Sequence, residues 1–139
     1  MMYRKILVGY DGSEAGKKAF DSALILAKNH GAELYVLAVV RPPEIGDDVE
    51  TEAVIGNSRE YHRKLLVPLR REAEQVGIQG HFEVAVGHPA EQIMYSADAH
   101  QVDLIVVGDR GRSKFARLLL GSVSKTVVQY ADRPVLVVR

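Results

Sequence analysis

The sequence predicts an α/β fold, in which a parallel five-stranded sheet carries helices on both faces. Short apolar runs rich in β-branched residues alternate along the chain with longer stretches whose apolar residues recur at helical spacing. This alternation is typical of strands joined by helical crossovers, and a fully apolar run suits a strand that is buried on both faces. At 139 residues the chain has the length of one domain, and we expect a single domain over residues 1–139.

The composition argues against several classes of function. Lys and Arg total 18, as do Asp and Glu, so the formal net charge is zero, whereas general binders of nucleic acid or membrane surfaces carry a basic excess. The absence of cysteine excludes disulfides, thiolate catalysis and cysteine–zinc sites. No apolar run approaches the ~18 residues of a membrane span, and the first residues show no secretory signal pattern. We therefore expect a cytoplasmic protein with no nucleic-acid or membrane partner.

A turn separates the first predicted strand from the first predicted helix. Residues 5–10 (KILVGY) have the length and composition of a buried strand. Either Asp11, with a glutamate three residues later, or Ser13 is suited to cap the helix that follows, and the sequence does not choose between them. Gly31 is expected to end this helix, and a second strand over Glu33–Val40 then stops at two prolines.

The region after the second strand is the hardest to interpret. Residues 44–55 are acidic and show little periodicity, so we predict a surface loop, partly helical at most, with a lid over a site as the alternative. Asn57 and Glu60 have capping-box spacing and predict the start of a helix there. Because Pro68 lies inside that helix, a kink or break is expected near residues 64–65.

The remaining elements repeat the alternation. Residues 81–86 (HFEVAV) alternate polar and apolar side chains, which is typical of a half-exposed or edge strand. Pro89 suits the first position of a third helix. Residues 102–107 form a fourth strand, a helix follows over Ser122–Tyr130, and Val135–Val138 form a fifth strand.

The ends of two strands suggest the order of the sheet. Ligands of parallel sheets bind at the carboxyl ends of the strands, where the strand order reverses. The first strand runs into Gly9 and Asp11 and the fourth into Gly108, so placing these strands side by side gives the order 3-2-1-4-5. The fifth strand then lies at an edge and is uniformly apolar, so it would pair non-specifically with other chains unless it is covered. We therefore predict a homodimer through Val135–Val138.

The segment after the fourth strand has the pattern of a phosphate-binding loop. Its glycines and serine have the spacing G-x2-G-x9-G-S and are Gly108, Gly111, Gly121 and Ser122. Glycines let the backbone approach a ligand, and the first amides of a helix carry partial positive charge. Four basic side chains lie in the same segment: Arg110, Arg112, Lys114 and Arg117. We prefer phosphate binding over a surface loop without ligand.

Other motifs are missing. The sequence has no P-loop, no G-x-G-x-x-G dinucleotide fingerprint and no G-x-S-x-G nucleophile elbow. The five histidines show no metal-ligand spacing and are expected at the surface or in capping positions. Among them His88, which precedes Pro89, is the one that the predicted fold brings nearest to the site, although a role in entering the helix is preferred.

The chain resembles the single-domain, ATP-binding subgroup of the universal stress protein family. The resemblance covers nearly the whole length and is carried by KILVGYDGS, GHPAEQI, VDLIVVGDRGRS and LLLGSVSKTVVQYADRPVLVV, together with the glycine spacing. It implies a Rossmann-like (adenine nucleotide alpha hydrolase-like) three-layer sandwich with strand order 3-2-1-4-5. It also implies a regulator or sensor in stress response that binds ATP, ADP or AMP.

The resemblance further implies a set of binding residues. Adenine and ribose would lie against Gly9, Asp11 and the backbone of Val39, while ribose and phosphate would lie against Val107, Gly108, Arg110 and Gly111. Phosphate oxygens would be held by Gly121, Ser122, Val123 and Ser124 through amides and hydroxyls. Arg110 stands where many family members have another residue, and it either contacts phosphate or folds outward.

Catalysis is the main alternative to regulation. Asp11 and Asp109 are possible ligands for Mg²⁺, but no residue stands out as a general base for water. A slow ATPase or self-phosphorylation at Ser122 or Ser124 therefore remains open, as does a dimeric interaction module that binds no nucleotide and acts on unknown protein partners.

Overall fold

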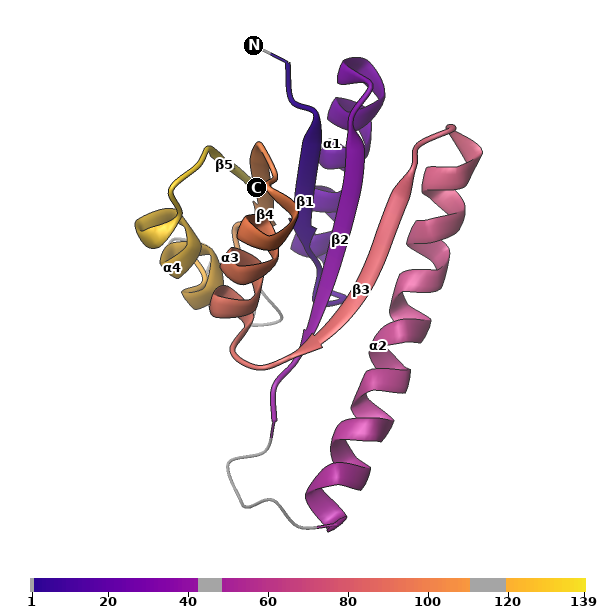
Figure 1. Cartoon of the computed structure of the whole chain (residues 1–139), viewed down its shortest axis with the longest axis vertical. Helices are drawn as coiled ribbons and strands as arrows, with labels where there is room; N and C mark the ends of the chain where they lie inside the picture. The colour runs from indigo at the N-terminus through magenta and orange to yellow at the C-terminus, as the bar shows by residue number, and fades with distance from the viewer. Residues whose placement is uncertain (1, 43–48, 111–119) are drawn as a thin grey trace.

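The computed structural model describes residues 2–42, 49–110 and 120–139, in which strands and helices alternate along the chain (Figure 1). The strands are β1 (Lys5–Gly9), β2 (Glu33–Val40), β3 (Gly80–Val86), β4 (Leu104–Gly108) and β5 (Val135–Val138). The helices are α1 (Glu14–His30), α2 (Val49–Gln75), α3 (Pro89–His100) and α4 (Ser122–Tyr130). Neighbouring strands are parallel and follow the order β3-β2-β1-β4-β5, which confirms the predicted sheet.

Helices cover both faces of the sheet, so the protein has three layers (Figure 1). One apolar cluster joins the sheet to α1 and α2, and the other joins it to α3 and α4. Strands β1 and β4 in the middle of the sheet each contribute to both clusters, and Ile6, Leu7 and Val8 of β1 are completely buried. Burying a side chain of this size contributes about 1.5–3 kcal/mol, which explains why the central strands are fully apolar runs.

The start of α1 settles which residue caps it. Ser13 is the N-cap, and its Oγ accepts a hydrogen bond from the amide of Gly16 at 3.0 Å. Asp11 instead accepts from the amide of Ser13 through Oδ1 at 2.9 Å, which shapes the turn ahead of the helix. Gly31 ends the helix at φ 66°, as predicted, because this left-handed conformation favours glycine.

Residues 44–55, predicted as a surface loop that is partly helical at most, are helical in their second half. Residues 49–55 form the first turns of α2, while residues 44–48, and with them the alternative of a lid, lie outside the described residues. Ala53 and Val54 are exposed, and Figure 1 shows this end of α2 extending past the ends of the strands. Exposed positions such as these need no apolar stripe, so the periodicity that marks other helices is missing here.

The predicted cap of α2 is wrong, and so is the predicted break at Pro68. Asn57 and Glu60 lie inside the helix and do not cap it, because α2 begins at Val49. The helix also continues through Pro68 without a break. Pro68 removes one backbone hydrogen bond to the carbonyl of Lys64, but both residues are exposed, so water can take the place of the missing amide.

The long α2 is tied to α1 as well as to the sheet. Leu66 and Leu69 of α2 are buried against the first apolar cluster. The Nζ of Lys17 on α1 lies 2.8 Å from Oε1 of Glu72 on α2 and 2.7 Å from Oδ1 of Asp21. Burial opposes the charge on Lys17, but these two carboxylates outweigh it and raise the pKa of the ammonium group. The contacts fix the position of α2 relative to the carboxyl ends of the strands.

Strand β4 begins later than predicted because the backbone of residue 102 bonds to the end of α3 and not to a neighbouring strand. Gln101 adopts a left-handed conformation with φ 52°, and the amide of Val102 donates to the carbonyl of Ala97. Asp103 then accepts hydrogen bonds from the amides of Arg4 and Lys5 through Oδ2, at 2.7 and 2.9 Å. These bonds align the starts of β1 and β4.

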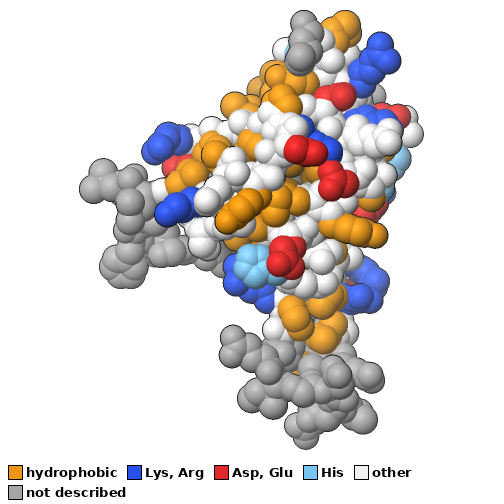
Figure 2. Space-filling view, turned by 60° about the vertical axis from the view of Figure 1, so that its left-hand side comes forward, with side chains coloured by type: hydrophobic (Ala, Val, Ile, Leu, Met, Phe, Trp, Pro, Cys, Tyr) orange, Lys and Arg blue, Asp and Glu red, His pale blue; other side chains and the backbone are white. Residues whose placement is uncertain are grey.

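The described surface is mixed in charge. On the face that Figure 2 shows, acidic and basic side chains are interspersed with hydrophobic ones, in line with the balanced composition. Among the helices within the described ranges, none combines the length and the apolar character that crossing a membrane requires.

Candidate functional site

A pocket of about 550 Å³ lies at the carboxyl ends of β1, β2 and β4. This is the position expected for a ligand site in an open parallel sheet, because the chain leaves the sheet in opposite directions from β1 and β4. The residues that line it are Gly9, Tyr10, Asp11, Gly16, Leu37, Val39, Arg41, His62, Pro89, Ile93, Val107, Gly108, Arg110, Gly121, Ser122, Val123 and Ser124.

The structure brings the predicted site residues together. Gly9 and Asp11 come from the end of β1, Val39 from β2, and Val107 and Gly108 from the end of β4. Arg110 and the four residues at the start of α4, Gly121, Ser122, Val123 and Ser124, complete the predicted set. Gly111, the remaining predicted residue, lies outside the described residues, as do Arg112, Lys114 and Arg117.

The start of α4 leaves backbone amides available to a ligand. Gly121 is the N-cap, and it has no side chain to satisfy the first amides of the helix. The first intrahelical hydrogen bond runs from the amide of Lys125 to the carbonyl of Gly121 at 2.8 Å. The amides of residues 122–124 therefore precede the helical ladder, and they carry the partial positive charge of a helix N-terminus.

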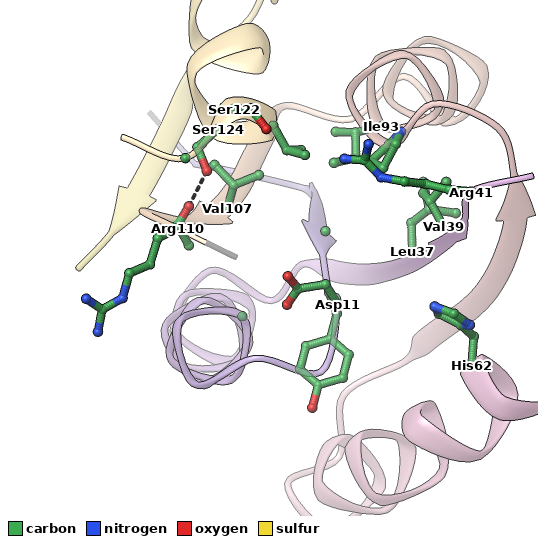
Figure 3. Close-up of a pocket in the computed structure, with 17 residues that line it drawn as sticks. Asp11, Leu37, Val39, Arg41, His62, Ile93, Val107, Arg110, Ser122 and Ser124 are labelled. Carbon is green, nitrogen blue, oxygen red and sulfur yellow. Dashed lines mark hydrogen bonds between the residues drawn. The ribbon is translucent and has the colours of Figure 1, made fainter. Parts of the chain in front are cut away.

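Two hydrogen bonds hold this helix end against β4. The amide of Gly121 donates to the carbonyl of Asp109 at 2.7 Å. The hydroxyl of Ser124, which is buried, donates to the carbonyl of Gly108 (Figure 3). The proton of the Ser124 hydroxyl is thus used within the protein, whereas Ser122 is exposed at the pocket.

Gly108 has a structural reason to be glycine. A Cβ atom at this position would lie 2.7 Å from the backbone carbon and oxygen of Ala15. The start of α1 therefore packs directly on the end of β4, and a side chain would push these elements apart. At Gly9 a Cβ would meet Cδ1 of Ile93 at 2.8 Å, which is the flexible end of a side chain. Gly108 contributes to the site by allowing α1 to approach.

The two arginines of the pocket point in different directions. Figure 3 shows the side chain of Arg110 extending away from the pocket and from Ser122, although its residue lines the rim. Arg41, which follows β2, extends across the opening toward Ile93. Of the two alternatives for Arg110, the structure therefore shows the outward one, and the arginine that turns inward was not predicted.

Several lining residues were missed, for different reasons. The missed residues are Tyr10, Gly16, Leu37, Arg41, His62, Pro89 and Ile93. Leu37 and Ile93 were recognisable as apolar positions of a strand and a helix, but nothing marked them as pocket walls. His62 is placed by the packing of α2, which no short motif reports. His88 is the N-cap of α3 and is not among the lining residues, so the structure places it as a helix-entry residue.

His62 is held in a defined orientation. Its Nδ1 lies 2.7 Å from the carbonyl oxygen of Ser58, one turn earlier on α2. The ring also packs edge-on against Tyr61, with the centroids 5.4 Å apart. Figure 3 shows the ring pointing toward the pocket.

Two other histidines form a separate cluster around Tyr35. The rings of His81 and His100 stack on Tyr35 with centroid distances of 4.5 and 4.4 Å. His81 pairs with Glu33 and His100 with Glu83, each at 3.3 Å. Burial and the hydrogen bond to Glu33 raise the pKa of the Tyr35 hydroxyl. None of these residues lines the pocket, and within the described ranges no three His, Asp or Glu side chains meet as metal ligands.

Comparison with known proteins gives a consistent result. The model of the universal stress protein family matches residues 2–139. Universal stress protein YxiE of Bacillus subtilis is 36% identical, over 99% of this chain and 100% of its own length. The structure of MJ0577 from Methanocaldococcus jannaschii aligns with a TM-score of 0.90 and 31% identity, over 99% of this chain and 96% of that one. A universal stress protein solved in complex with cAMP aligns with a TM-score of 0.79 and 27% identity, over 100% and 99%.

Proposed function

Because the chain belongs to the universal stress protein family, we propose that its pocket binds an adenine nucleotide and that the bound nucleotide regulates its action in a stress response. The observation that carries this proposal is the open N-terminus of α4 at the edge of a pocket that is otherwise lined largely by apolar side chains. Such a helix end attracts phosphate, and apolar walls suit a base. The relative solved with cAMP supports the same class of ligand.

The pocket divides into a phosphate end and a base end. The phosphates would lie at Gly121–Ser124, where the amides of residues 122–124 donate to their oxygens. The base would lie on the opposite side, against Leu37, Val39 and Ile93. Asp11, between the two ends, would accept hydrogen bonds from ribose hydroxyls, since a carboxylate accepts hydrogen bonds at both of its oxygens.

ATP, ADP and AMP all fit this scheme, and they differ in what lies beyond the first phosphate. With ATP, Asp11, which lines the pocket, would hold a Mg²⁺ ion that offsets the charge of the phosphates, whereas Asp109, the other predicted ligand, is not among the lining residues. We regard binding, and not hydrolysis, as the main activity. Release of phosphate from ATP under single-turnover conditions, abolished by a site variant, would instead make the protein a slow ATPase or phosphotransferase.

Isothermal titration calorimetry with ATP and AMP tests the proposal. We expect saturable binding of one nucleotide per chain. Because the phosphates are charged and the helix N-terminus that would hold them carries partial positive charge, raising the salt concentration should weaken the binding. No heat of binding at millimolar nucleotide, with a protein whose circular dichroism shows it to be folded, would refute the proposal. If a nucleotide does bind, mass spectrometry of ligand that copurifies with the protein will show which nucleotide the cell supplies.

We also propose a homodimer through β5. This strand stands at the end of the sheet order and pairs with β4 on its inner side. It is entirely apolar in sequence, and Leu136 on it is 37% exposed. An apolar edge of this kind favours pairing with a second copy. Light scattering coupled to size exclusion should give the mass of a dimer at micromolar concentration, and a monomer there would contradict the proposal.

A further inference from the structure

The base end of the pocket contains a polar side chain whose hydrogen-bonding state the structure defines. His62 is the α2 residue that lines the pocket within the described part of the chain. Figure 3 places it on the opposite side from Ser122 and Ser124, close to the wall formed by Leu37 and Val39. A ligand whose phosphate lies at α4 would therefore present its base, and not its phosphate, to His62.

The contact with Ser58 determines which ring nitrogen carries the proton. A backbone carbonyl oxygen can only accept a hydrogen bond, so the Nδ1 of His62, 2.7 Å from it, must be the donor. In the neutral imidazole, Nε2 then has a lone pair and no proton. The ring therefore offers the pocket a hydrogen-bond acceptor.

The other polar side chain at this end of the pocket has the opposite character. Arg41 carries only donors, and it extends toward Ile93. Arg41 cannot accept a hydrogen bond from an exocyclic amino group. Such a group has two N–H donors, and Nε2 of His62 could accept one of them.

We infer that His62 selects a 6-amino purine over a 6-oxo purine in this pocket. Adenine presents an amino group at C6, which donates to Nε2. Hypoxanthine and guanine present a carbonyl oxygen there, which cannot donate to Nε2, so the hydrogen bond to His62 is lost and two acceptors face each other. The inference rests on the proposed binding of nucleotides and adds to it the residue that distinguishes adenine. A polar site of this kind rejects a mismatched group more strongly than an apolar wall does.

The test compares AMP with IMP, which differ in the 6-amino or 6-oxo group and in the hydrogen that the 6-oxo purine carries on N1. Calorimetry should give wild-type protein a preference for AMP of about tenfold, the value of one hydrogen bond and one mismatched acceptor. In His62→Phe, which keeps an aromatic ring but has no acceptor, the preference should fall by about five- to tenfold. Arg63→Ala is the matched control, because Arg63 is the next residue on α2, is exposed and does not line the pocket.

The outcomes separate this inference from the proposed function. Binding of AMP with the same AMP/IMP ratio in wild-type and His62→Phe protein would overturn the role of His62 and leave nucleotide binding intact. No binding of AMP by the wild type would overturn both.

A second measurement does not depend on a variant. Nitrogen-15 NMR of the wild-type imidazoles should show that AMP shifts the Nε2 resonance of His62 while Nδ1 stays protonated. Saturation with AMP without such a shift would also overturn the inference.

Discussion

The phosphate end and the base end of the pocket are assembled from the chain in different ways. At the phosphate end, β4 and the start of α4 meet across a few local contacts, including the hydrogen bonds from Gly121 to Asp109 and from Ser124 to Gly108. At the base end, Leu37, Ile93 and His62 come from β2, α3 and α2, which are far apart in the sequence. The phosphate end is therefore formed by neighbouring residues of one segment, whereas the base end depends on how several elements pack together.

This difference determines how each end is expected to respond to substitution. The phosphate end uses backbone amides, so it is sensitive to changes that add atoms near the backbone. The base end uses side chains that stand on separate elements, so removing one of them leaves the others in place. Single substitutions should thus have large effects at the first end and graded effects at the second.

The largest effect is expected for Gly121→Val. The backbone at Gly121 has φ −60° and ψ 155°, which valine adopts without strain, so the variant should fold. Its side chain would stand between the ligand and the amides of residues 122–124, and loss of two charged hydrogen bonds corresponds to about 3 kcal/mol or more. The affinity for ATP should fall at least ~100-fold in calorimetry.

Gly56→Val provides the control for that variant. Gly56 is exposed on α2, and a Cβ there would meet nothing within 4 Å. Its affinity for ATP should match the wild type. A folded Gly121→Val protein with unchanged affinity would show that the phosphates do not lie at α4.

Gly108→Ala tests whether that glycine serves packing. The added Cβ would lie 2.7 Å from backbone atoms of Ala15, which cannot move without moving α1. We expect the free energy of unfolding, measured by urea denaturation, to fall by about 2–3 kcal/mol. In the control Gly56→Ala, loss of a helical glycine should raise stability by up to about 1 kcal/mol. Equal stability of Gly108→Ala and the wild type would contradict the close approach of α1 and β4.

The two serines of α4 are expected to have different roles at the phosphate end, because Ser124 stabilises the fold and Ser122 is exposed at the pocket. Ser124→Ala removes a buried donor and leaves the carbonyl of Gly108 without it, so the free energy of unfolding should fall by about 1–2 kcal/mol. Ser122→Ala changes an exposed hydroxyl, and its stability should stay within about 0.5 kcal/mol of the wild type. If the two variants unfold at the same urea concentration, the Ser124 hydroxyl does not hold the helix.

The same difference explains what the sequence could and could not predict. The strand order, the strands, Gly108 and the residues Gly121–Ser124 follow from local patterns, because apolar runs, glycines and a helix start lie next to one another in the chain. His62 and Arg41 depend on where α2 packs and how a side chain turns, and neither leaves a signal in a short stretch. The helical turns at residues 49–55 were predicted only as part of a loop, because exposed positions such as Ala53 and Val54 give no repeating apolar face.

The smallest effects are expected for the two arginines of the pocket, Arg41 at the base end and Arg110 next to the phosphate end. Arg41 turns across the base end, where its planar guanidinium can lie against a purine, whereas Arg110 points away from the pocket (Figure 3). Because Arg41 is exposed, Arg41→Ala should weaken AMP binding by only about two- to fivefold, in the range of a surface interaction. Arg110→Ala should change the affinity for AMP by less than about twofold.

Calorimetry at two salt concentrations distinguishes an arginine that contacts the base from one that contacts phosphate, since contact with a neutral base depends little on salt and contact with phosphate depends strongly on it. A larger, salt-dependent loss in Arg110→Ala would mean that this side chain turns inward to the phosphates when the ligand binds.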